Sequence, residues 1–214
     1  MLRPSPTRRA LAALPLLAVL PSAGRAAPAG AIDQLRAFLS QTRAASGEFT
    51  QRVAGGKGAV PQVSSGRFVF QRPGRFRWVY EKPYEQVLVA DGERLYLYDK
   101  DLNQVTVKRI AAALPASPAA ILFGTDDFER EFTVTELGER DGLAWLEARP
   151  RAKESQFERI AIGFRDGLPA ALELADGFGQ TTHLRLARVQ RNPKVDAQTF
   201  RFTPPPGAEV LQER

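Results

Sequence analysis

Aromatic and charged residues alternate along the stretch from residue 75 to residue 80. Three large aromatic side chains fall on every second residue there, and Arg75 and Arg77 lie between them. Because successive side chains of a strand point to opposite faces, this pattern predicts one aromatic face and one largely charged face. The preceding strand carries two phenylalanines in the same parity. The predicted apolar face consists of Phe68, Phe70, Phe76, Trp78 and Tyr80.

The same parity places Arg72 on the apolar face or at its rim. A guanidinium is costly to bury without partners, so this arginine is the candidate for fastening a cover over the face. The alternative is a side chain that extends along the rim into water. The apolar segments 68–70, 76–80 and 87–89 are consecutive, and we expect them to form one continuous concave wall. The simpler alternative is the core of a β-sandwich, packed by its own second sheet.

Asp-Gly pairs recur at four places between β-rich segments. They begin at Asp91, Asp141, Asp166 and Asp176. Asp-Gly is the strongest short hairpin signal, because both central residues of that turn need positive φ. The four pairs, together with the alternating segments, predict an antiparallel meander of about ten or eleven strands.

Two segments have helical rather than strand periodicity. Residues 31–45 place apolar side chains at helical spacing, which predicts an amphipathic helix that ends near Ser46-Gly47. Residues 110–130 interrupt the strands. Ser117-Pro118 forms a helix start and Gly124 a stop, so we expect a short apolar helix between them. Both segments are expected to act as lid helices over the apolar wall.

Residues 1–26 have the pattern of a cleaved secretion signal. A basic start precedes the apolar run 10–20, and small residues suit cleavage after Ala26. Thr7-Arg8-Arg9 leaves the twin-arginine and the general secretion routes both open. Cleavage takes away four arginines and lowers the net charge from +6 to +2, so charge gives no case for nucleic acid. We expect residues 27–214 to form a single domain.

Reactive side chains are scarce. The chain has no cysteine and one histidine, and the parity of His183 in its strand predicts that it faces solvent. We therefore expect no metal site, no cofactor and no enzyme activity, since no histidine is placed to activate a serine. Without cysteine there is also no lipid-modified N-terminus, and we expect a soluble monomer.

The order and spacing of several short motifs resemble the LolA family of periplasmic lipoprotein carriers. The motifs are Gly47-x-Phe49-x-Gln51, Arg72-Pro73 followed by Phe76-x-Trp78, Asp91-Gly92, and Phe200-x-Phe202-x-Pro204-Pro205-x-Gly207. The resemblance spans residues 32–210. It implies a mainly β fold, an incomplete antiparallel β-barrel whose concave apolar face is closed by short helices. A third proline, Pro206, and a short tail depart from the family pattern, so a shorter C-terminal strand is expected.

The resemblance also implies a function. The family carries lipoproteins by their acyl chains, which an inner-membrane ABC transporter loads and an outer-membrane receptor unloads. On this comparison Arg72 is the latch that bonds the lid backbone. The expected cavity residues are Phe68, Phe70, Phe76, Trp78, Tyr80, Leu122 and Phe123. The alternative is a lipid-sensing or lipoprotein-sensing regulatory domain on the same fold, but such a regulator usually carries a second domain.

Overall fold

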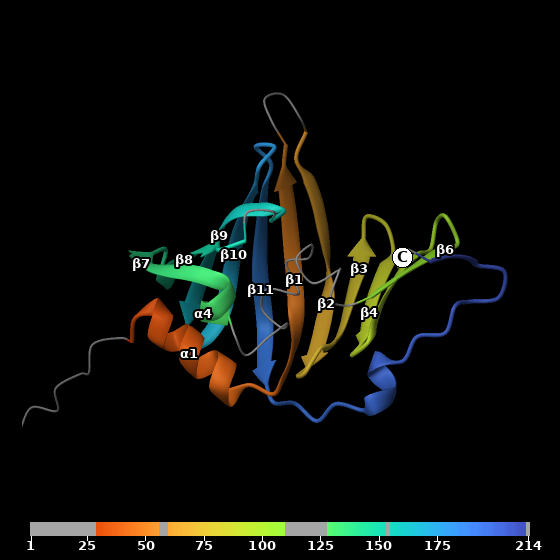
Figure 1. Ribbon diagram of the computed structural model, residues 1–214, viewed down its shortest axis with the longest axis horizontal. Coiled ribbons are helices and arrows are strands. Elements are labelled where there is room, and N and C mark those ends of the chain that lie inside the picture. The colour runs from red at the N-terminus through yellow and green to blue at the C-terminus, as the bar shows by residue number, and fades with distance from the viewer. Residues whose placement is uncertain (1–28, 56–59, 110–127, 153–154, 213–214) are drawn as a thin grey trace, which may run out of the picture.

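The computed structural model describes residues 29–55, 60–109, 128–152 and 155–212. Within them, twelve strands form one sheet, and two helices lie on one of its faces (Figure 1). The strands are β1 (Ala44–Ala54), β2 (Gln62–Gln71), β3 (Arg75–Lys82), β4 (Gln86–Asp91), β5 (Arg94–Asp99), β6 (Gln104–Arg109), β7 (Phe132–Arg140), β8 (Leu143–Pro150), β9 (Phe157–Arg165), β10 (Leu168–Asp176), β11 (Thr181–Arg191) and β12 (Glu209–Gln212). The helical elements are α1 (Ala31–Gln41), α4 (Phe128–Glu131) and the 3-10 helix η2 (Ala197–Phe200).

None of the described helices is long and apolar enough to cross a bilayer. The predicted secretion signal and most of the segment 110–130 lie outside the described residues.

The sheet consists of two meanders joined side by side. Strands β1 to β6 follow one another as neighbours, β7 to β11 do the same, and β1 pairs with β11. Every pair is antiparallel except the last, in which β12 runs parallel to β6. Because β7 and β12 are the two end strands and do not pair with each other, the sheet stays open. The predicted fold, a mainly β incomplete barrel, is confirmed, with twelve described strands rather than ten or eleven.

All four Asp-Gly pairs join neighbouring antiparallel strands. In Asp141-Gly142 the φ angles are 55° and 68°, and in Asp166-Gly167 they are 52° and 73°. Positive φ at both central residues is the hairpin geometry that the sequence predicts. The other two turns use the aspartate differently. The side-chain Oδ1 of Asp91 accepts from the amides of residues 93 and 94, and that of Asp176 from the amides of residues 178 and 180.

Helix α1 is shorter than the sequence predicts. It ends at Gln41, and Thr42 already has extended backbone angles, φ −108° and ψ 101°. Strand β1 begins at Ala44, which already pairs with the last residue of β2. Alanine favours a helix, but pairing at the centre of the sheet outweighs that preference. The helix packs against β7 to β10, with Leu35 and Phe38 buried beneath it (Figure 1).

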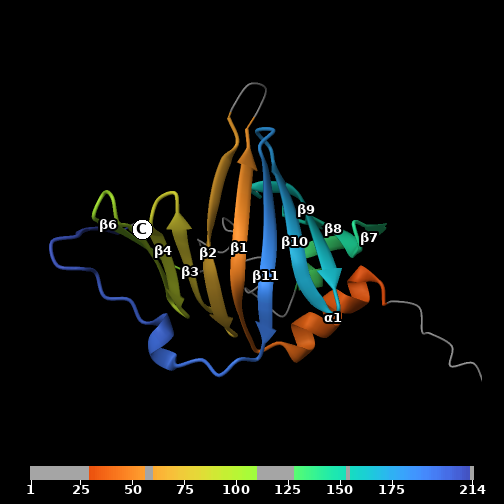
Figure 2. The same cartoon turned by 180° about the vertical axis from the view of Figure 1, so that it is seen from behind.

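The C-terminal segment covers part of the face opposite α1. Arg77, on that face, donates from Nη1 to the carbonyl oxygen of Thr199 at 3.5 Å. Phe200 is 2% exposed, and Phe202 packs on Tyr96 with 5.5 Å between ring centres. The chain then runs to β12, the short strand at the sheet edge (Figure 2). The face predicted to be largely charged is therefore partly covered by aromatic side chains from the far end of the chain.

Candidate functional site

The five predicted aromatic residues lie on the sheet face that α1 covers, called here the inner face. In the β2–β3 pair, Phe68 lies opposite Trp78, and Phe70 lies opposite Phe76. Directly opposite residues in an antiparallel pair point to the same face. All four are at most 4% exposed, and Tyr80, further along β3, is partly buried. Whether they line a cavity for a ligand stays a prediction.

The aromatic wall continues into β4. Leu88 lies opposite Trp78, so it belongs to the inner face. Val89 lies opposite Arg77 and belongs to the other face, called here the outer face. Segment 87–89 therefore adds Leu88 to the inner face, while Val87 and Val89 lie on the outer face. Strand β4 is apolar on both faces because its outer face is also covered, by the C-terminal segment.

An aromatic stack forms the centre of the inner face. The ring of Trp78 stacks on Phe49 of β1 at 4.2 Å between centres and on Phe68 at 5.4 Å. Tyr80 meets Phe49 edge to face at 5.1 Å. Gly66 makes room for the stack, since a Cβ there would lie 3.1 Å from the Phe49 ring and would collide with the backbone of β3. Phe49 belonged to a sequence motif but not to the predicted cavity residues.

The inner face extends across β8 to β11, which the prediction of the wall did not include. Alternate residues of these strands are buried there, and the two-residue period was a usable signal. These residues are Leu146, Ala148, Ile160, Ile162, Phe164, Leu172, Leu174, Leu184 and Leu186. Together with the aromatic residues and the buried side chains of α1 they form one continuous apolar core.

Tyr80 gives the aromatic wall a polar group. Its hydroxyl donates to Oε1 of Gln51 at 3.2 Å. Burial raises the pKa of Tyr80, and hydrogen bonds with Trp78 and Gln51 act in the opposite direction. The phenol is therefore neutral at neutral pH, and this part of the wall carries no charge.

Arg72 lies where β2 ends, at the edge of the aromatic wall. Its Nε donates to the carbonyl oxygen of Thr42 at 3.2 Å, and its backbone N–H donates to the carbonyl oxygen of Arg43 at 2.7 Å. Its guanidinium carbon is 5.6 Å from the ring centre of Phe70. Because Thr42 directly follows α1, Arg72 holds the end of that helix. The lid carbonyls predicted as its partners, at residues 114–123, lie outside the described residues, as do the predicted cavity residues Leu122 and Phe123.

A pocket of about 630 Å³ opens beside Arg72, between the end of α1, the β2–β3 turn and α4. Its lining residues are Arg36, Leu39, Ser40, Thr42, Arg43, Arg72, Pro73, Glu129 and Arg130. Four arginines face a single glutamate, so the pocket is basic. Such a pocket suits the polar part of a ligand whose apolar part lies on the inner face.

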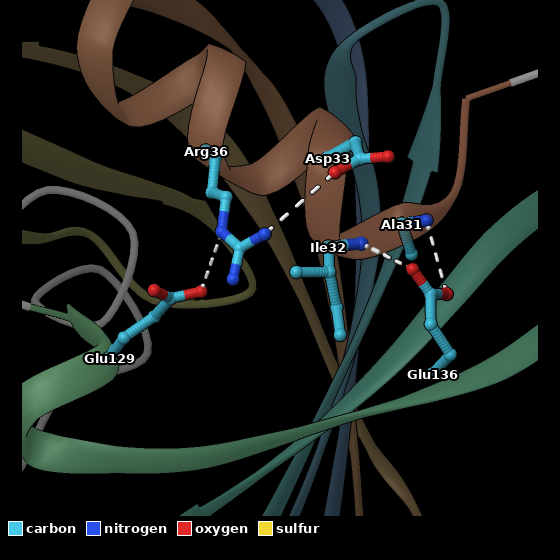
Figure 3. A network of polar contacts seen from close by, with 6 residues as sticks. All are labelled: Ala31, Ile32, Asp33, Arg36, Glu129 and Glu136. Atoms are coloured by element: carbon cyan, nitrogen blue, oxygen red, sulfur yellow. Dashed lines mark hydrogen bonds and ion pairs between the residues drawn. The ribbon is translucent and has the colours of Figure 1, made fainter.

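The start of α1 is held by polar contacts from β7 and α4 (Figure 3). Gly30 has no side chain to cap the helix. Instead, the carboxylate of Glu136 accepts from the amides of Ala31 at 3.1 Å and Ile32 at 2.7 Å. A carboxylate at this end satisfies free amides and interacts favourably with the helix dipole. One turn later, Arg36 pairs with Glu129 of α4 at 2.9 Å.

Other candidate chemistry does not gather at the site. His183 is exposed, as predicted. The described part of the chain contains no group of three or more histidine, aspartate or glutamate side chains that could hold a metal ion.

Comparison with known proteins agrees with the geometry. The family profile described as outer membrane lipoprotein carrier protein LolA matches residues 40–203. A relative from Cupriavidus pinatubonensis is 52% identical over 200 residues, which cover 92% of this chain and 94% of the relative. A relative from Bordetella pertussis is 45% identical and covers 96% and 98%. Both relatives are named outer-membrane lipoprotein carrier protein.

Two solved structures have a similar fold at low sequence identity. A LolA superfamily protein from Nitrosomonas europaea has a TM-score of 0.51 at 9% identity, over 79% of this chain and 95% of that one. An uncharacterised conserved protein from Thermus thermophilus has a TM-score of 0.54 at 14% identity, over 85% and 96%. At such identities the likeness shows the fold alone.

Proposed function

Because the chain belongs to the LolA family of outer membrane lipoprotein carrier proteins, we propose that it binds the acyl chains of lipoproteins on its inner face and carries them through the periplasm. The observation that supports this most is the continuous inner face around Trp78, in a sheet that stays open. Stacked aromatic rings and aliphatic side chains bind hydrocarbon without requiring hydrogen bonds from it.

The cover over this face adjusts the affinity. Each methylene that an acyl chain buries contributes about 0.8 kcal/mol, so three chains alone would bind almost irreversibly. Phe68, Phe76 and Trp78 are at most 4% exposed. An acyl chain therefore reaches them only after covering residues move, and the free energy of separating the cover from the wall offsets part of the gain. Helix α1 covers the neighbouring part of the inner face, over β7 to β10, and its Phe38 meets Phe70 of the wall edge to face at 6.4 Å between ring centres.

The proposed partners follow from the family. An inner-membrane ABC transporter loads the carrier, and an outer-membrane receptor unloads it. The transporter supplies the energy from ATP, and the carrier acts as a monomer without a cofactor, without nucleic acid and without catalysis. The basic pocket beside Arg72 is suited to the polar part of the lipoprotein, next to its acyl chains.

Photo-crosslinking from the two faces of β3 tests the acyl site. A benzophenone amino acid at Phe76 lies on the inner face, and the same group at the neighbouring Arg75 is exposed on the outer face. We expect the group at Phe76 to capture the acyl chains of a bound triacylated lipoprotein, and the group at Arg75 to capture none. Equal capture from both positions contradicts the proposal. Native mass spectrometry of protein isolated from periplasm gives a second readout, the mass of a triacylated passenger.

A further inference from the structure

The sheet has two unlike ends. From the antiparallel order, the connections β1–β2, β3–β4, β5–β6, β8–β9 and β10–β11 all lie at one end, called here the tip end (Figure 1). The connections β2–β3, β4–β5, β7–β8 and β9–β10 lie at the other end, where α1 joins β1. The described residues of the connections β1–β2, β3–β4, β5–β6 and β10–β11 form no helix, while α4 leads into β7 beside the fifth connection, β8–β9.

Exposed apolar side chains gather at the tip end. Eight large hydrophobic residues are exposed in the described part of the chain, and five of them lie on its hairpins. These five are Val60 at 90%, Val63 at 54%, Tyr84 at 65%, Leu102 at 69% and Phe178 at 96% exposure. The other three, Leu137, Val210 and Leu211, lie in the two edge strands of the sheet.

The turns of the opposite end have a different composition. They consist of charged residues, glycine and one proline: 72–74, 91–93, 141–142 and 166–167. Single exposed hydrophobic residues are common on protein surfaces and need no explanation. The five exposed hydrophobic residues of the tip end, however, lie on four different hairpins at the same end of the sheet, and this distribution does need an explanation.

From this asymmetry we infer that the tip end is a membrane-contact surface, which inserts its apolar side chains into the interfacial layer of a phospholipid bilayer. Neighbouring tips are two strands apart, or about 10 Å. The apolar residues are therefore separate anchors rather than one contiguous patch. A protein partner concentrates binding energy in a central cluster, whereas a bilayer offers a continuous layer in which separated anchors can all be accommodated.

The charges at the tips favour a neutral lipid surface. Lys82 and Glu85 flank Tyr84, and Lys100 precedes Asp101 beside Leu102. Lys100 also pairs with Glu85 at 2.7 Å, across the two hairpins. With both signs present, attraction to anionic lipid contributes little. Contact should be driven by apolar insertion, with Val60 and Phe178 as the main anchors, because they are the most exposed and their hairpins are adjacent through the β1–β11 pair.

The contact is expected to be weak and reversible, as a shuttling protein requires. A few partly inserted side chains should give a partition constant on the order of 10⁴ M⁻¹, the value that a single myristoyl chain reaches. The inference does not depend on the proposed acyl site, because it concerns binding to bare lipid at residues outside the inner face.

The absence of cysteine from the sequence allows a direct test. The exported protein, with its amino terminus checked by mass spectrometry, is made with Phe178→Cys or with Leu137→Cys as the matched control. Each variant is labelled with the environment-sensitive dye NBD and mixed with phosphatidylcholine vesicles. We expect the dye at position 178 to brighten and shift to the blue, and the dye at position 137 not to respond. No response at position 178, or equal responses at both positions, overturns the inference.

Vesicle flotation of unlabelled protein gives a second readout. The double variant Phe178→Ser and Leu102→Ser should lose at least tenfold in partition constant. The control double variant Leu137→Ser and Val210→Ser, which removes two exposed apolar residues elsewhere, should lose none. Binding that disappears at about 0.5 M salt, where charge interactions are screened, would show an electrostatic contact and contradict insertion. Acyl capture from position 76 should be unchanged in all variants. An experiment that contradicts membrane contact by the tip end can therefore be told apart from one that contradicts acyl binding on the inner face.

Discussion

At the residue scale, Arg72 joins the apolar wall to its cover. It lies beside Phe70 and bonds the backbone at Thr42, immediately after α1. A guanidinium at such a place needs hydrogen-bond acceptors, and a carbonyl that follows a helix end is a ready one. The contact with Thr42 supports a latch on α1, beside the bonds to the second lid segment that the sequence predicts.

Replacement of Arg72 with leucine tests the latch. The change removes the bond to Thr42 and adds apolar surface beside Phe70, and both effects favour the open, loaded carrier. We expect Arg72→Leu to accept lipoprotein from the transporter but to release it to the receptor about tenfold more slowly or worse, since a hydrogen bond from a charged group contributes about 1.5–3 kcal/mol. The measurement is transfer in two separate steps with purified components.

Arg43→Leu is the matched control for the latch. Arg43 lines the same basic pocket, so this variant changes the charge of the rim equally and leaves the Nε bond of Arg72 to Thr42 in place. It should not slow the release of lipoprotein to the receptor. If Arg72→Leu loads poorly and unloads normally, the arginine serves docking rather than closure.

At the element scale, α1 is attached by polar contacts along its length and by apolar contacts on its buried side. Glu136 bonds the first amides, and Asn192 donates from Nδ2 to the carbonyl oxygen of Gln41 at 2.9 Å. Leu35 and Phe38 supply the apolar part. In the proposed function these contacts must break when α1 moves away from the inner face.

Removal of the carboxylate at the start of α1 should loosen the helix. Glu136→Ala leaves two amides without an acceptor, which is expected to cost about 1 kcal/mol, as the loss of a helix cap does. Hydrogen exchange of the α1 amides should accelerate, and a fluorescent fatty acid should enter the inner face faster. Glu139→Ala, an exposed glutamate on the same strand, is the control and should change neither rate. Unchanged fatty-acid entry despite faster exchange would show that α1 is not part of the cover.

The elements also show how far the sequence could predict this fold. The alternation around Trp78 placed the aromatic residues on one face, because β3 has charged residues on the other side. In β4 the same method gives no assignment, since Val87, Leu88 and Val89 are all apolar and their pattern does not distinguish the two faces. Both faces of β4 are apolar because the C-terminal segment, far along the chain, covers its outer face, and the sequence of β4 itself does not show this. The sequence also could not predict that Glu136 caps the start of α1, because the two residues that form this contact are 105 positions apart.

At the scale of the whole molecule, one sheet has two covers with different roles. Over β7 to β10 the inner face is covered by α1, and in the proposed function that cover must move. The outer face of β3 to β5 is covered by the C-terminal segment, through Phe200 and Phe202. Polar and apolar contacts tie this segment to strands that also form the aromatic wall. We infer that it stiffens the wall from behind, so that the inner cover can open without loss of the fold.

Truncation of Phe200 separates these two roles. Phe200 is 2% exposed, and Phe200→Ala should lower the free energy of unfolding by about 3–5 kcal/mol, as loss of a buried ring does. Phe178→Ala removes the same ring from a position that is 96% exposed and should change stability by no more than about 0.5 kcal/mol. Urea denaturation followed by circular dichroism measures both values. Because the ring of Phe200 lies behind the sheet, acyl capture from position 76, compared at equal folded fraction, should be the same in Phe200→Ala and in the unsubstituted protein. A fall in capture without a fall in stability would mean that the outer segment takes part in acyl binding rather than in stiffening the wall.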